Sequence, residues 1–358
     1  MMYGTFSFRQ VFEMTRQIDV GGVLVGGGAP VSIQSMTNTP THDVEATLRQ
    51  IRMLSAAGCD IVRVAVPDMR AAKAVGALKA GSPVPLVADI HFDHRLALEA
   101  AAQGIDKIRI NPGNIGAPER VAEVACACKE RGIPIRVGVN GGSLEKELLA
   151  KYGGPTPEAM VDSALGQIRS LERYGFHDIC VSLKTSSVST TMRAYRLMAE
   201  RYDYPLHLGV TEAGTPELGE LKSAAGIGGL LALGIGDTIR VTLTADPVEE
   251  VIAARKLLKA IGLRREGPEL IACPTCGRTK INLIPMARQV EELLKDVDKP
   301  ITVAVMGCVV NGPGEASHAD VGIAGGCGEG VLFKHGQIVS KVPEDRLVPE
   351  LMKLIETL

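Results

Sequence analysis

The cysteines of the carboxyl-terminal quarter have the spacing of a metal site. Cys273 and Cys276 form a Cys-x-x-Cys pair, and Cys308 follows in the loop GCVVNGPGE, which ends on Glu315. A Cys-x-x-Cys turn brings two thiolates to one metal centre, and a zinc ribbon usually repeats that pair. Cys327 is an available fourth thiolate for zinc. A [4Fe-4S] cluster fits as well or better, with Glu315 as a weak oxygen ligand, although a loop glutamate is usually solvated.

A second chemical feature is a set of cations on one face of the predicted strands. Successive strand residues point to opposite sides, and here polar residues alternate with Val, Ile and Leu. The cations of the polar parity are Arg63, Arg109, Arg136, Lys184 and Arg240, and Asp89 is the acid of that parity on the same strands. If the apolar parity faces helices, these cations face an enclosed interior, where unpaired charge is costly. The set therefore predicts an anionic ligand, a phosphate or diphosphate.

Pairing of these cations with acids of the neighbouring loops is the structural alternative. The acids available for it are Asp68, Asp93, Glu212 and Asp237. One arginine could well be paired in this way. Five cations of a single parity favour a ligand, because isolated buried charges are rarely kept for stability.

More polar residues stand at the ends of the predicted strands. They are Asp89 and His91 in ADIHFD, Asn111 in RINPGN, Asn140 in GVNGG, and His207 and Glu212 in HLGVTEAG. We predict that the two asparagines and His207 join the cations in binding the ligand. Glu212 and Asp89, with His91, are candidate proton donors or bases, although a carboxylate beside arginines is more often a salt-bridge partner.

Eight short β-branched runs carry these residues, and a stretch of helical periodicity follows each run. The runs are residues 31–36, 60–66, 85–90, 107–111, 134–140, 178–184, 205–211 and 238–244. Eight strand-helix units predict a (β/α)8 TIM barrel, in which the carboxyl ends of the strands carry the active site. A doubly wound open sheet is the alternative for the same alternation.

The pattern changes after the barrel. We place the barrel domain at residues 1–262 and a small α+β domain, which contains the cysteines, at residues 263–358. Before the first barrel strand, the Gly-rich stretch RQIDVGGVLVGGGAPV predicts a hairpin. Its glycines do not follow the strand-to-helix order that a dinucleotide-binding loop needs.

Composition narrows the classes of function. The 358 residues are 46% hydrophobic with a net charge of -2, which favours neither nucleic acid nor a membrane surface as a partner. The amino-terminal segment has no basic stretch followed by an apolar run, and we expect a cytoplasmic protein. Any positively charged site must be local.

Several stretches together resemble the bacterial 4-hydroxy-3-methylbut-2-enyl diphosphate synthase family of the methylerythritol phosphate pathway. They are QSMTNT, VRVAVPD, LVADIHF, IRINPGNIG, IRVGVNGGSL, SLKTS, HLGVTEAG, CPTCGR and GCVVNGPGEA. The resemblance runs essentially from end to end. It implies a TIM barrel followed by an iron-sulfur domain, in the short form that lacks the extra domain of plant-type members.

The resemblance also implies an activity. In this family 2-C-methyl-D-erythritol 2,4-cyclodiphosphate is reductively opened to (E)-4-hydroxy-3-methylbut-2-enyl diphosphate, with two electrons and loss of water. The family's [4Fe-4S] ligands map onto Cys273, Cys276, Cys308 and Glu315, and its diphosphate-binding positions onto Arg63, Arg109, Arg136 and Lys184. Homodimers and a flavodoxin or ferredoxin donor are usual.

Two other classes of function remain open on the residues alone. One is a zinc-containing TIM-barrel aldolase or transferase that acts on a phosphorylated substrate. The other is a non-enzymatic protein that binds a phosphorylated metabolite. Analysis for iron and acid-labile sulfide would distinguish an iron-sulfur reductase from the zinc-containing alternative. Turnover would distinguish an enzyme from a binding protein.

Overall fold

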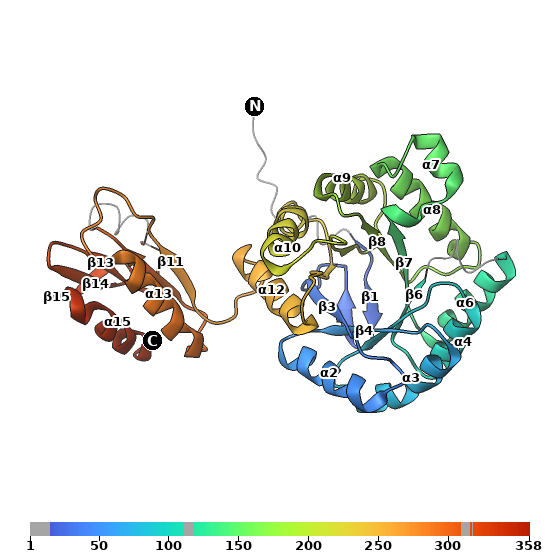
Figure 1. Cartoon of the computed structure of the whole chain (residues 1–358), viewed down its shortest axis with the longest axis horizontal. Coiled ribbons are helices and arrows are strands. Elements are labelled where there is room, and N and C mark those ends of the chain that lie inside the picture. Colours follow the sequence, from blue (N-terminus) through green and yellow to red (C-terminus); the bar gives the residue numbers. More distant parts are fainter. Residues whose placement is uncertain (1–14, 111–116, 309–315, 317) are drawn as a thin grey trace. The chain divides into compact units, whose positions relative to one another are not determined.

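The structure, a computed structural model, describes residues 15–110, 117–308, 316 and 318–358. It divides into two compact units, Met1–Leu263 and Arg264–Leu358, each with its own hydrophobic core (Figure 1). Two predicted site residues, Asn111 and Glu315, lie outside the described residues.

The first unit is built on eight parallel strands. They are β3 (Ser32–Met36), β4 (Ile61–Ala65), β5 (Leu86–Asp89), β6 (Lys107–Ile110), β7 (Ile135–Asn140), β8 (Ile179–Lys184), β9 (His207–Leu208) and β10 (Thr238–Ile239). Strands β3 to β8 pair in chain order, and β10 joins β9 to β3. A bridge between Val181 and Leu206 connects β8 to β9. The ring closes, which confirms the predicted TIM barrel and rules out the open sheet.

Helices surround the ring (Figure 1). They are α2 (Val44–Ala56), α3 (Met69–Gly81), α4 (His94–Ala102), α6 (Pro118–Arg131), α7 (Lys146–Tyr152), α8 (Pro157–Glu172), α9 (Val188–Ala199), α10 (Pro216–Ser223), α11 (Gly229–Leu231) and α12 (Pro247–Ala260). Many begin with a side-chain cap; at α12, Asp246 accepts from the Val248 amide and Pro247 opens the first turn. Within the described ranges, no helix is long and apolar enough to cross a membrane.

The two parities of the barrel strands have different surroundings. Val62, Val64 and Val137 belong to the large core that also includes the helix residues Ile51 and Leu78. Residues of the opposite parity therefore face the barrel interior, here called the lumen. This assigns the polar parity, cations included, to the lumen.

A hairpin lies against the amino-terminal end of the lumen. Strands β1 (Ile18–Val20) and β2 (Val23–Val25) pair antiparallel around Gly21 and Gly22, which both have positive φ. Their apolar residues form one buried cluster with Ile61, Val87 and Cys180, which stand near the starts of β4, β5 and β8. The amino-terminal end is thus packed with apolar side chains, which leaves the carboxyl end for a ligand to enter.

The second unit is a small α+β fold, as predicted. Its sheet has the order β11 (Glu269–Ala272), β12 (Thr302–Met306), β13 (Val321–Gly325), β14 (Glu329–Lys334) and β15 (Gln337–Pro343). The first three strands are parallel, and β13 to β15 are antiparallel. Helices α13 (Leu283–Leu293) and α15 (Leu347–Glu356) bury their apolar faces in one core with the sheet. The carboxyl ends of β11 and β12 share one edge.

Candidate functional site

Asp89 connects two of the lumen cations. Its carboxylate lies 3.1 Å from Arg109 Nη1 and 3.5 Å from Arg63 Nε. Burial alone would raise the pKa of Asp89, but Arg63 and Arg109 outweigh it and lower that pKa to about 2. Asp89 is therefore ionised at neutral pH, and the structure places it as a salt-bridge partner of these arginines.

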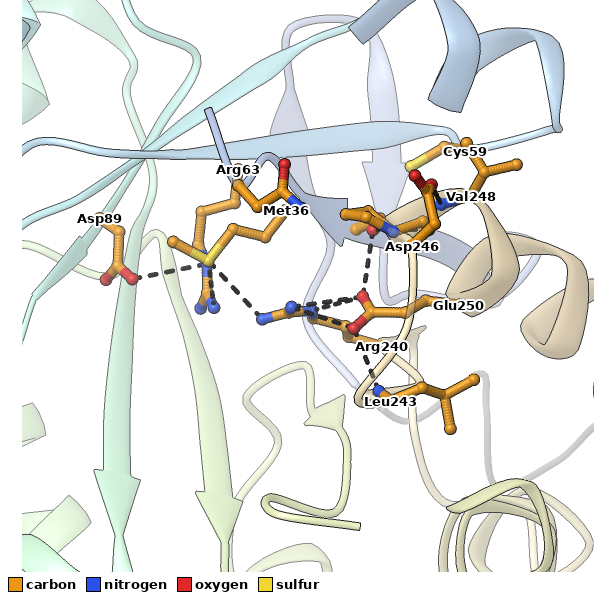
Figure 2. A network of polar contacts seen from close by, with 12 residues as sticks. Met36, Cys59, Arg63, Asp89, Arg240, Leu243, Asp246, Val248 and Glu250 are labelled. Atoms are coloured by element: carbon orange, nitrogen blue, oxygen red, sulfur yellow. Dashed lines mark hydrogen bonds and ion pairs between the residues drawn. The ribbon is translucent and has the colours of Figure 1, made fainter. Parts of the chain in front are cut away.

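Arg240 is held by an acid of helix α12. Glu250, which is 5% exposed, accepts from Arg240 Nε and Nη2 at 3.3 Å. The Met36 sulfur lies on the other side of Arg240, 3.7 Å from its Nη1, and 3.0 and 3.2 Å from Nη2 and Nε of Arg63. Figure 2 shows the thioether between the two guanidiniums. We call Arg63, Asp89, Arg109, Arg240 and Glu250 the paired sector of the lumen.

The other lumen cations have no acidic partner among the described residues. Arg136 is 1% exposed, Lys107 is fully buried, and Lys184 is 8% exposed. Arg136 Nε and Nη1 and Lys107 Nζ lack any hydrogen-bond partner in the described part of the chain. Both ring nitrogens of the fully buried His207 are also without one there. We call Lys107, Arg136, Lys184 and His207 the unpaired sector.

Burial sets the protonation of the unpaired sector. It lowers the pKa of Lys107 to about 8 and that of Arg136 to about 10, and it lowers that of Lys184 as well. Burial and then Lys184 and Arg136 lower the pKa of His207 well below its usual value, so this imidazole is neutral at pH 7. Unpaired buried cations of this kind favour binding of an anion, which would restore the lost solvation.

Two glycines provide space for lumen side chains. A Cβ atom on Gly138 would lie 2.7 Å from Arg109 Nε, and one on Gly209 would lie 2.6 Å from Lys184 Nζ. Any larger residue at either position would displace a cation. Strand β7 and the position directly after β9 thus carry glycine where Arg109 and Lys184 need room.

Other predicted residues lie at the carboxyl ends of the strands. Asn140 and Glu212 line one pocket of about 510 Å³, together with Thr185 and Thr211. Glu212 is exposed and has φ of +52°, a left-handed backbone that is uncommon outside glycine. His91 is exposed, with its ring 6.0 Å from that of Phe92. Their catalytic roles stay predictions.

The loop acids that offered a structural alternative mostly bind elsewhere. Asp68 and Asp93 cap the helices that follow them. Asp237 accepts from the Leu206 amide, and burial raises its pKa to about 6. The acid that pairs with Arg240 is instead Glu250, from a helix.

Sequence reasoning missed two charged residues of the lumen. Lys107 has the parity of Arg109 on the same strand, so strand alternation alone could have identified it. Glu250 occupies a position of α12 flanked by the buried Val251, Ala254 and Leu257. A carboxylate on the apolar face of a helix is a signal for a buried pair, since such a group is rarely buried alone.

In the second unit, Cys273 and Cys308 follow neighbouring parallel strands. Cys273 comes directly after β11, and its amide donates to the Val305 carbonyl at 3.0 Å. Cys308 is the second residue after β12 and is 8% exposed. The Lys280 amide donates to the Gly307 carbonyl at 2.9 Å, which returns the turn containing Cys276 to the segment before Cys308. The backbone thus brings the three cysteines to the same edge of the sheet.

The chemistry of the turn suits a metal ligand. Hydrogen bonds from the backbone and side chain of Arg278 lower the pKa of Cys276, which favours its thiolate. In the described residues, no group of three or more His, Cys, Asp or Glu side chains is arranged to hold a metal ion. Cys327 lies in the turn between β13 and β14 and is exposed.

Comparison with known proteins gives the family. A family model described as the GcpE TIM-barrel domain matches residues 15–255, and one described as the GcpE protein C-terminal domain matches residues 269–357. The chain belongs to the GcpE family. Both GcpE domains are thus present, in the order that the fold shows.

Curated GcpE relatives match over nearly the whole chain. A protein of Caldanaerobacter subterraneus subsp. tengcongensis is 60% identical over 344 residues, which cover 96% of this chain and 97% of the relative. A protein of Geobacter sulfurreducens is 61% identical over 345 residues, covering 95% and 98%. Both are named 4-hydroxy-3-methylbut-2-en-1-yl diphosphate synthase (flavodoxin).

Solved structures match the GcpE barrel in fold only. Dihydropteroate synthase from Xanthomonas albilineans with 4-aminobenzoic acid has a TM-score of 0.50 and 16% identity. The match covers 69% of this chain and 97% of that one. At this identity the likeness concerns the barrel architecture.

Proposed function

We propose that this chain catalyses the reductive ring opening of 2-C-methyl-D-erythritol 2,4-cyclodiphosphate to (E)-4-hydroxy-3-methylbut-2-enyl diphosphate, a step in isoprenoid precursor synthesis. The near full-length relatives carry the name of this synthase. The observation that carries the proposal within the molecule is the unpaired sector, whose buried cations lack acidic partners among the described residues. A diphosphate supplies the missing negative charge.

The two sectors would act on different stages of the reaction. Arg136 and Lys184 bind phosphoryl oxygens and order the substrate in the lumen. When the carbon–oxygen bond of the ring breaks, negative charge grows on the diphosphate oxygen that leaves carbon. The preorganised guanidiniums of the paired sector would stabilise that charge without reorganisation, which lowers the activation barrier. Asn140 and His207 would add hydrogen bonds to the ligand.

Loss of water from the substrate needs a proton at the departing oxygen. Glu212, in the pocket at the carboxyl end of the barrel, is the proposed donor. His91 is the second candidate donor, and Asp89, which is ionised, would act only as a proton acceptor. Asn111 is a further proposed substrate ligand outside the described residues.

Cys273, Cys276, Cys308 and Glu315 would hold a [4Fe-4S] cluster. Three cysteines on one sheet edge, one with a favoured thiolate, support this assignment by their donor chemistry. When bound, the cluster supplies the two electrons one at a time. Flavodoxin, which the relatives' name includes, is the proposed donor, with ferredoxin as a substitute. We further propose a cytoplasmic homodimer.

The experiment is metal analysis followed by turnover. Protein purified without oxygen should contain iron and acid-labile sulfide, and should convert the cyclodiphosphate when a strong one-electron reductant is present. Protein with zinc but neither iron nor sulfide would contradict the cluster. Intact cluster without turnover of the cyclodiphosphate would contradict the substrate.

A further inference from the structure

Two guanidiniums of the paired sector meet at a single neutral atom. The Met36 sulfur accepts from Arg63 at 3.0 and 3.2 Å and from Arg240 at 3.7 Å. Two cations held this close repel each other, and a carboxylate between them would be the ordinary remedy. A thioether is a weak acceptor without charge, so it orients both groups and cancels neither. The thioether thus adds no negative charge between the two guanidiniums, whose carboxylate partners are Asp89 and Glu250.

Glu250 is buried and has several hydrogen-bond partners beside this pair. Besides Arg240, its carboxylate accepts from the Leu243 amide at 3.1 Å and from Ser35 Oγ at 3.2 Å. Ser35 is fully buried on β3, next to Met36. The carboxylate thus has partners on both the strand and the segment after β10, and it fixes the direction in which Arg240 reaches Met36 (Figure 2).

We propose that Met36 and Glu250 are positioning residues, which hold Arg63 and Arg240 as a preformed pair of guanidiniums for one phosphoryl group of the substrate. The identity of that substrate rests on the function proposed above. Neither residue need touch the ligand, because each acts through an arginine. Preorganisation of this kind lowers the ordering cost that binding must overcome.

The direction in which Glu250→Gln changes anion affinity distinguishes a positioning role from a purely electrostatic one. Glu250→Gln removes a negative charge near the anion site, so a purely electrostatic role predicts tighter anion binding. A positioning role predicts weaker binding, because Arg240 loses its charged anchor. The neighbouring Glu249 is exposed on the same helix, and Glu249→Gln is the matched control for charge.

The experiment measures calorimetric binding of inorganic diphosphate to the cluster-loaded protein, together with KM and kcat for the cyclodiphosphate. For Met36→Leu, which keeps the volume and loses the acceptor, we expect diphosphate affinity and KM to worsen about three- to tenfold. Its kcat should fall as well, because the same guanidiniums stabilise the charge on the leaving oxygen, and Met36→Gln, which restores an acceptor, should recover most of both losses. Met53→Leu, at an exposed methionine, is the control and should match the unmodified protein.

For Glu250→Gln we expect affinity to fall about tenfold, with Glu250→Asp recovering part of it and Glu249→Gln silent. Tighter diphosphate binding by Glu250→Gln, or unchanged binding by Met36→Leu, would overturn the inference. The Met36 series carries the test if Glu250→Gln fails to fold. Failure of the proposed function would appear differently, as diphosphate binding by the unmodified protein without turnover of the cyclodiphosphate.

Discussion

The two sectors of the lumen use the same kinds of side chain in opposite ways. In the paired sector every described cation has an acid or Met36 within contact distance, so its geometry is set before any ligand arrives. In the unpaired sector the side chains are also buried, and the described residues offer no acid. The comparison indicates that the first sector is organised by the protein itself. We propose that an anion completes the second.

The largest expected effect is the loss of an unpaired cation. Arg136→Met should abolish most turnover, by about a thousandfold or more, because a charged contact to the diphosphate disappears. Without ligand, the same change should raise the free energy of unfolding by about 1 kcal/mol or more, since an unpaired buried charge is removed. Denaturant unfolding and steady-state kinetics measure both.

The matched control is Arg169→Met, at an exposed arginine of α8, which should change neither quantity appreciably. Destabilisation by Arg136→Met would mean that Arg136 has a structural partner, and the distinction between the sectors would fail at that residue.

Removing Asp89, one of the two acids of the paired sector, should lower the stability of the fold, which is opposite to the effect expected for Arg136→Met. Asp89→Asn leaves Arg63 and Arg109 without their carboxylate, and we expect a loss of about 3 kcal/mol in the free energy of unfolding. The direction of the pKa shift of Asp89 determines how stability depends on pH. A folded pKa of about 2, below the unfolded value near 3.9, means that ionised Asp89 stabilises the fold above about pH 5, and that this is lost as the pH falls towards 2.

Acid unfolding therefore tests the paired sector. The Asp89→Asn protein should be less stable at pH 7 and should lose less stability than the unmodified protein between pH 5 and pH 2. Parallel stability curves for the two proteins over that range would show that the carboxylate is not stabilised by the arginines.

Strand alternation is enough to predict the five cations and Asp89 as one inward set, because a closed parallel barrel turns parity directly into position. It also encodes Lys107, which shares the parity of Arg109. Alternation says nothing of Glu250, because a helix residue reaches Arg240 only after α12 packs against β3. The role of Met36 is equally hidden, since a methionine in a strand is normally core packing. Side-chain partners across the ring depend on closure, which no local pattern specifies.

A smaller effect should appear in the pH dependence of anion binding. An anion beside Lys107 favours its charged form and raises its pKa from about 8, so binding takes up a proton at higher pH. Affinity should therefore fall above pH 8, by at most about tenfold per pH unit for one proton. Sulfate is a suitable probe, because its own charge is constant between pH 6 and pH 10. Lys107→Met should bind sulfate more weakly at pH 7 and with a shallower slope, and an unchanged slope would remove Lys107 from the unpaired sector.

The smallest expected effect concerns Cys327, which has no proposed task, in contrast to the proposed cluster ligand Cys308. Cys308 lies next to β12 on the edge shared with Cys273, whereas Cys327 is exposed in the turn between β13 and β14. Cys327→Ser should leave iron content, acid-labile sulfide and turnover within about twofold of the unmodified protein, because a proposed ligand set of three thiolates and Glu315 does not need it. Cys308→Ser is the comparison and should lose most of the iron. Loss of iron in the Cys327→Ser protein would instead favour four thiolates, and Glu315 would then no longer be needed as a ligand.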